Sequence, residues 1–135
     1  KQLAEMKRRK RKLVDPLQFE MSIQAEDLSS YTPSFGWQMA PPTDKQRELL
    51  IKKGIFPDEI ENAGKAEMII DRLIKREKEG LATPLQIRKL ERYGFRNVGM
   101  WEFEHTKKFI GRIAENGWKV PRSINPYEYK PGDNV

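Results

Sequence analysis

The chain matches itself when it is shifted by forty residues, and this repeat limits its fold more than any other feature. The matched positions are those expected to begin a helix, to end it or to form its apolar side. The pairs are Thr43/Thr83, Gln46/Gln86, Leu50/Leu90, Gly54/Gly94, Ile55/Phe95, Ala66/Thr106, Ile69/Phe109, Ile70/Ile110, Arg72/Arg112 and Leu73/Ile113. Each copy is too short to bury an apolar face alone, so the repeat predicts two small helical units packed together. Such a module favours binding over catalysis.

Helix signals recur at the same place in each copy. Thr43 and Thr83 are each followed three residues later by glutamine, the pattern of a reciprocal capping box. Pro84 stands at a first helical position, where its missing N–H costs nothing. A glycine follows each first helix and predicts a left-handed turn. We therefore predict helical hairpins at 43–80 and 81–121, with amides at the two capped starts that can donate to phosphate oxygens.

The segment before the repeats shows two other patterns. Gln2 to Val14 are good helix formers, and Asp15-Pro16 ends that run. Apolar and polar residues then alternate from Leu17 to Ile23, which is typical of a half-buried strand. The predicted order is a basic helix at 1–14, an extended arm and connector at 15–42, helical repeats at 43–80 and 81–121, and an irregular tail at 122–135. The predicted fold class is mainly α: two tandem helical-hairpin repeats with an N-terminal basic helix and a short strand-like arm.

Length and composition bound the class of protein. A chain of 135 residues suits one modest domain with tails. It begins at Lys1 rather than Met, which indicates a piece of a longer protein. Cysteine is absent, which excludes disulfides and thiolate zinc sites. No apolar run approaches the roughly 18 residues that span a bilayer, and no signal peptide opens the chain. We expect a cytoplasmic protein with no membrane partner.

Positive charge is concentrated at the start of the chain. The net charge is +6, of which residues 1–15 contribute +5. The run from Lys7 to Lys12 attracts phosphate by counterion release, although it is equally typical of a solvated helix face or a frayed domain boundary. The cations predicted to contact nucleic acid are Lys7, Arg8, Arg9, Lys10, Arg11, Lys12, Arg72, Arg76, Arg88, Lys89, Arg92 and Arg112. The three tryptophans Trp37, Trp101 and Trp118 either stack on bases or pack in the core.

The sequence contains no recognisable catalytic pattern. Neither the G-x-x-x-x-G-K-[ST] nor the G-x-G-x-x-G phosphate loop occurs. His105 is the only histidine, and its place on the polar side of a helix predicts a solvated residue. One imidazole without cysteine makes a poor transition-metal site. We expect no catalytic residue, no metal and no cofactor.

Six segments, spread in order over residues 15–121, together resemble a known family. They are DPLQFEMSI (15–23), YTPSFGW (31–37), PPTDKQRELLIKKGI (41–55), ENAGKAEMIIDRL (61–73), GLATPLQIRKLERYGF (80–95) and IAENGWKVP (113–121). This set resembles the C-terminal region of phage and prophage DEAD/DEAH-box (superfamily 2) ATP-dependent helicases. The resemblance implies a tail that follows the second motor domain of a translocase acting on DNA or RNA. The family's ATPase motifs match no position here, so this chain is expected neither to bind nor to hydrolyse ATP. Glu102 departs from the better capping residue expected after the tryptophan.

Two functions follow from these observations. The first is an accessory nucleic-acid-binding module that contacts backbone phosphates, with the basic run in its favour. The alternative is a structural or protein-interaction module that docks on the motor domains of the same chain or on a partner protein. The near-neutral net charge of +1 over residues 16–135 favours the second.

Overall fold

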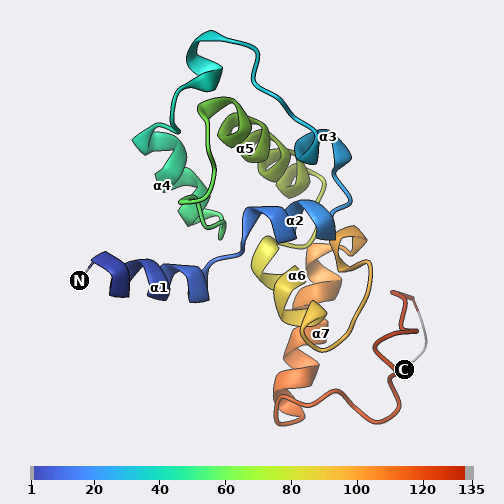
Figure 1. Cartoon of the computed structure of the whole chain (residues 1–135). Helices are drawn as coiled ribbons and strands as arrows, with labels where there is room; N and C mark the ends of the chain where they lie inside the picture. The colour runs from blue at the N-terminus through green and yellow to red at the C-terminus, as the bar shows by residue number, and fades with distance from the viewer. Residues whose placement is uncertain (1, 133–135) are drawn as a thin grey trace.

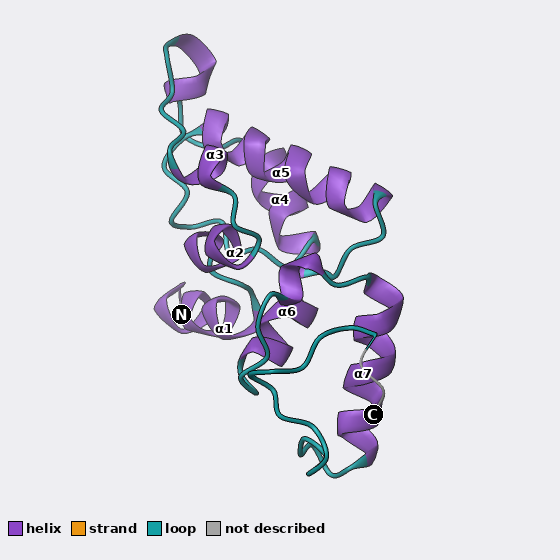
Figure 2. Ribbon diagram, turned by 90° about the vertical axis from the view of Figure 1, so that its right-hand side faces the viewer, coloured by secondary structure: helices purple, strands orange, loops and turns teal. Residues whose placement is uncertain are grey.

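The computed structural model describes residues 2–132, apart from the side chains of Met6, Lys7, Arg9, Lys10 and Arg11. Within that range the chain is helical and forms no strand (Figures 1 and 2). The elements are α1 (Gln2–Lys12), α2 (Pro16–Ser22), α3 (Glu26–Ser29), the 3-10 turn η1 (Gly36–Met39), α4 (Asp44–Lys52), α5 (Ala63–Lys78), α6 (Pro84–Glu91), the 3-10 turn η2 (Val98–Met100) and α7 (Phe103–Glu115). The prediction of a mainly α fold is confirmed.

Both predicted capping boxes form. The amide of Gln46 donates to Thr43 Oγ1 over 3.1 Å, and the Thr43 amide donates back to Gln46 Oε1 over 3.0 Å. The start of α6 repeats this arrangement between Thr83 and Gln86, over 3.2 and 3.0 Å. These side chains fix where α4 and α6 begin. They also occupy amides that are predicted to donate to phosphate oxygens, so neither helix start offers its full set of donors to a ligand.

The helix pairs α4–α5 and α6–α7 follow the forty-residue period. Helices α4 and α6 start at residues 44 and 84, and α5 and α7 start at 63 and 103. Gly54 and Gly94 follow α4 and α6 with φ of +91° and +97°, the left-handed conformation that ends a helix. The second helices differ in length, with 16 residues in α5 and 13 in α7. That the two pairs are copies of one packed unit stays a prediction.

The strand predicted within 17–23 is wrong, because this segment is helix α2. Asp15 is the N-cap and accepts from the amide of Gln18 over 3.0 Å, while Pro16 takes the first helical position. The buried apolar residues Phe19 and Ile23 are four positions apart, which is helical spacing, and Leu17 and Met21, which alternate with them, are exposed. The arm is therefore a pair of short helices, α2 and α3, rather than extended chain.

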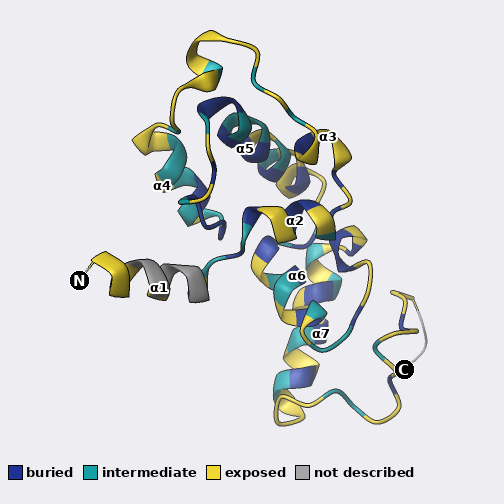
Figure 3. Cartoon of the chain, in the orientation of Figure 1, coloured by how far each residue is buried: buried dark blue, intermediate teal, exposed yellow. Residues whose placement is uncertain are grey.

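Helix α2 lies between the two helix pairs and contributes to one shared core (Figures 1 and 3). Phe19 is 1% exposed, and Arg76 of α5 lies over its ring at 6.0 Å. Val14, just before α2, joins the turn after α4: its amide donates to Gly54 O over 2.7 Å, and its carbonyl accepts from Phe56 over 2.8 Å. The first part of the segment predicted as arm and connector, residues 15–28, thus contributes to the core of the domain.

An aromatic cluster closes the second pair. Phe95, Trp101, Phe109 and Tyr129 pack with their ring centroids 4.8–6.0 Å apart. Trp101 is buried, so the core interpretation is confirmed for this tryptophan. His105 lies at the edge of the cluster, with Nε2 2.9 Å from the Tyr129 hydroxyl and its ring stacked on the tyrosine. The expectation of a solvated histidine is wrong, because the C-terminal segment folds back over it.

Candidate nucleic-acid interface

The chain divides into regions of opposite charge. Residues 16–80 hold nine basic and twelve acidic residues, a net charge of −3. Residues 81–135 hold ten basic and six acidic residues, a net charge of +4. Residues 1–15 add a net charge of +5, so the net positive charge lies in the N-terminal segment that contains α1 and in the segment that contains the second helix pair. The near-neutral total over residues 16–135 hides this division, and a polyanion is attracted to only one part of the molecule.

Helix α1 extends away from the body of the domain (Figure 1). Of the predicted basic run, Arg8 and Lys12 have described side chains, and both are exposed. The side chains of Lys7, Arg9, Lys10 and Arg11 lie outside what the structure describes, although their backbone belongs to α1. The run is therefore helical, and its two described side chains are accessible to a ligand.

Arg88 of α6 holds the end of α1 in place. Its Nη1 donates to Leu13 O over 2.7 Å and its Nη2 to Lys12 O over 3.3 Å. These carbonyls belong to the last residue of α1 and the residue after it, where helical partners are missing, so the guanidinium acts as a C-cap from another helix. Burial lowers the pKa of Arg88, and Arg92 lowers it further, but arginine stays charged at neutral pH. Arg88 thus fixes the basic helix beside α6.

Two other predicted cations have partners inside the protein. Arg76 is buried and donates from Nη2 to Ala82 O over 2.9 Å, which ties α5 to the start of the second pair. Burial lowers its pKa, with a raising contribution from Glu79 and a lowering one from Arg72. Arg76 is therefore inaccessible to a ligand and does not belong to the predicted interface. Arg72 forms an ion pair with Asp27 of α3, so its charge is already matched.

The remaining predicted cations, Lys89, Arg92 and Arg112, are exposed on α6, α7 and the turn after α6. The ion pairs between described side chains are Arg47–Asp58, Lys53–Glu77, Lys65–Glu20, Arg72–Asp27 and Lys75–Glu79. All of them lie within residues 16–80. Among described side chains, no cation of α6 or α7 forms an ion pair.

Aromatic side chains accompany two cations of this surface. Lys89 Nζ lies 4.2 Å from the ring centroid of Trp118, and Trp118 is half exposed. Arg96 lies 4.8 Å over the ring of Tyr127, which is also exposed. Arg96 and Tyr127 were missed by sequence reasoning. The only sequence signal for Tyr127 was an aromatic residue in a tail interrupted by prolines, and nothing in the sequence places that tail beside α6.

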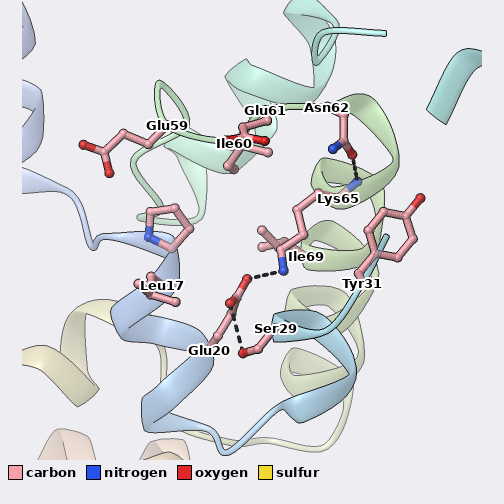
Figure 4. A pocket seen from close by; sticks show the side chains of 11 residues that line it. Leu17, Glu20, Ser29, Tyr31, Glu59, Ile60, Glu61, Asn62, Lys65 and Ile69 are labelled. Atoms are coloured by element: carbon pink, nitrogen blue, oxygen red, sulfur yellow. Dashed lines mark hydrogen bonds and ion pairs between the residues drawn. The ribbon is translucent and has the colours of Figure 1, made fainter. Parts of the chain in front are cut away.

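A separate cavity of about 270 Å³ lies between α2, α3 and α5 (Figure 4). Its central polar groups satisfy one another. Lys65 Nζ forms an ion pair with Glu20 Oε1 at 2.7 Å and donates to Leu28 O, and Ser29 Oγ donates to Glu20 Oε2 over 3.2 Å. Lys65 is on α5 and Glu20 on α2, so the pair joins the two elements. This geometry describes a structural ion pair.

Within residues 2–132 no three acidic, histidine or cysteine side chains gather into a possible metal site. No helix of the described chain has the length and apolarity to cross a membrane.

Comparisons with protein-family models, with curated proteins and with solved structures find no significant match.

Proposed function

We propose that this chain is a nucleic-acid-binding accessory module that contacts backbone phosphates. The supporting observations are that the exposed cations Lys89, Arg92 and Arg112 form no ion pair with a described carboxylate, and that Arg88 of α6 holds the end of the basic helix. Phosphate contacts need charge and access rather than a shaped cavity, and this surface provides both. The resemblance to the C-terminal region of ATP-dependent helicases supports the same assignment, with the ATPase supplied by motor domains outside residues 1–135.

Fluorescence anisotropy of a labelled oligonucleotide at several salt concentrations tests the proposal. In one variant Arg8, Lys12, Arg92 and Arg112 become glutamine; in the control Lys45, Lys52, Lys75 and Lys78 do. All eight side chains are exposed, and each variant loses four positive charges. We expect the first variant to bind weakly, with a slope of log affinity against log salt reduced by about 0.7 per lost contact to a single strand. The control should bind nearly as well as the unaltered chain. Equal losses in both variants, or no binding by the unaltered chain at low salt, would refute the proposal.

A second candidate function is protein docking, and the loop around η1 favours it. Residues 32–42 contain no charged side chain, and Phe35, Trp37 and Met39 are all exposed. The loop stands away from the cationic surface (Figure 1) and is tied to α5 by a hydrogen bond from the Ala63 amide to Ala40 O over 2.7 Å. Exposed aromatic residues without nearby charge suit apolar contact with another protein domain.

Hydrogen exchange separates the two functions. If motor domains dock on this loop, the amides of residues 32–42 exchange more slowly in a longer protein that includes them than in this chain alone. A Phe35→Ser/Trp37→Ser variant should remove that protection and leave oligonucleotide binding unchanged. Unchanged exchange rates in the longer protein would contradict docking at this loop.

A further inference from the structure

The C-terminal segment after α7 is anchored on the domain and exposes two aromatic side chains. Ile124 and Tyr129 are buried in the core. The Ile124 amide donates to Pro121 O over 3.0 Å, and the Tyr129 amide donates to Asn125 O over 2.9 Å. Tyr127, which lies between these two anchors, is 63% exposed, and Trp118, which precedes them, is 50% exposed. The exposure therefore belongs to an ordered segment whose neighbours are fixed.

The backbone at Trp118 has an unfavourable conformation. Its φ is +63°, directly after Gly117 with φ +71°. A bulky residue seldom adopts this left-handed conformation, which costs on the order of 1–3 kcal/mol unless its surroundings hold it. Here the Trp118 amide donates to Ile113 O over 2.9 Å, and the Tyr93 hydroxyl donates to Trp118 O over 3.0 Å. Burial offsets little of the cost, since half of the side chain is exposed.

Trp118 and Tyr127 both lie next to the turn that ends α6. Tyr93 contacts Trp118 through its hydroxyl. A Cβ on the next residue, Gly94, would lie 3.6 Å from the Tyr127 ring. Each ring also has its own cation: Lys89 at 4.2 Å for Trp118 and Arg96 at 4.8 Å for Tyr127. The same turn thus presents two aromatic–cation pairs.

We propose that Trp118 with Lys89, and Tyr127 with Arg96, form a stacking surface for single-stranded nucleic acid. This inference rests on the proposed function and specifies its substrate class. A nucleotide offers one base and one phosphate, which match one aromatic ring and its adjacent cation. Bases of a duplex are already stacked on their neighbours, whereas an unpaired base is free to stack on a side chain. The surface therefore selects single strands over duplexes.

Anisotropy with a fluorescein-labelled oligothymidylate and with a duplex of equal length tests the inference. Trp118→Ala and Tyr127→Ala should each weaken single-strand binding by about tenfold or more, the usual contribution of one stacked base. Duplex affinity and the salt slope should stay the same, because no phosphate contact is removed. Trp118→Phe should retain most of the single-strand affinity of the unaltered chain. The matched control is Trp37→Ala, since Trp37 is 59% exposed in the uncharged loop and should not contribute.

The outcomes separate this inference from the proposed function. Circular dichroism first establishes that each variant folds, and Tyr127→Ala keeps the test valid if Trp118→Ala does not fold. Equal losses for single strand and duplex, or no loss in the folded variants, overturn the stacking surface and leave phosphate binding intact. Failure of the unaltered chain to bind either probe at low salt overturns both.

Discussion

Replacing Lys65 with methionine should destabilise this domain strongly, because the change leaves a buried carboxylate without its charge partner. The Glu20 side chain is 4% exposed, and its Oε1 lies 2.7 Å from Lys65 Nζ. Methionine keeps most of the apolar stem of lysine and removes the ammonium, so packing changes little. Glu20 then retains the Ser29 hydroxyl on its other oxygen, and Leu28 O loses the donor from Lys65.

The size of the effect follows from this arrangement. Breaking one side of a buried ion pair costs about 3–5 kcal/mol, because the remaining charge is buried and unpaired. Total stabilities are typically 5–15 kcal/mol, so a large part of the free energy of unfolding is lost. Lys75→Met on the same helix is the control: its side chain is 71% exposed and lies 4.0 Å from Glu79. Such an exposed i,i+4 pair contributes about 0.5 kcal/mol or less.

Urea unfolding followed by circular dichroism at neutral pH gives the free energies of unfolding. The double variant Glu20→Gln/Lys65→Met removes both charges and should recover at least about 2 kcal/mol of the loss in Lys65→Met. The reasoning is refuted if Lys65→Met is no less stable than Lys75→Met. It is also refuted if the double variant is as unstable as Lys65→Met, since the loss would then reflect packing rather than an unpaired charge.

Three further changes test other parts of the structure. Gly99→Ala should lower the free energy of unfolding, measured by urea titration, by about 1–3 kcal/mol, because its Cβ would lie 2.6 Å from Ser22 O. Its matched control, Gly111→Ala in α7, has open space around its Cβ and should raise the free energy of unfolding by about 0.5–1 kcal/mol. Thr83→Ala should cost about 1 kcal/mol in the same titrations, because it removes one half of the capping box of α6. Arg88→Met should leave α1 without its cap, and faster tryptic cleavage within α1, together with weaker helical circular dichroism, is the expected result; unchanged cleavage would contradict the capping role.

The ends of helices were predictable from sequence because their signals are local. The capping boxes at Thr43 and Thr83 involve residues three positions apart, so no distant contact is needed to recognise them. The glycines at 54 and 94 adopt the left-handed conformation expected of helix-ending residues. These features depend on the backbone of a few neighbouring residues, and the rest of the fold changes them little.

Helix α2 was mispredicted because a short apolar alternation fits two periods. Four apolar residues at alternate positions look like a strand when all four are assumed to lie on one face. Only Phe19 and Ile23 are buried, and which side of the segment is buried depends on α5 and the second pair, far away in the sequence. The Asp15-Pro16 pair was interpreted only as the end of α1, although aspartate followed by proline is also a good helix start.

The roles of the arginines depend on contacts between distant parts of the chain. Arg88 caps a helix whose last carbonyl acceptor, Leu13, is 75 residues away, and Arg76 donates to a carbonyl in the next connection. Sequence reasoning treats each of them as a surface cation, because charge alone does not identify the partner. Arg92 and Arg112 have the same charge but remain exposed. Burial, rather than residue type, separates arginines that stabilise the fold from those available to a ligand.

The difference between partnered and exposed arginines changes what the net charge of the chain implies about its binding partner. A nearly neutral chain after residue 15 first favoured protein docking over nucleic-acid binding. The structure shows that the ion pairs between described side chains all lie in the acidic segment 16–80, where cations are matched within the protein. The cations of α6 and α7 have no such partners among the described residues. Because interactions between exposed charges are screened beyond about 10 Å at 0.1 M salt, a phosphate responds to this local surface and not to the sum over the chain. The same composition therefore combines a segment whose cations are largely paired within the protein with one whose described cations form no ion pair.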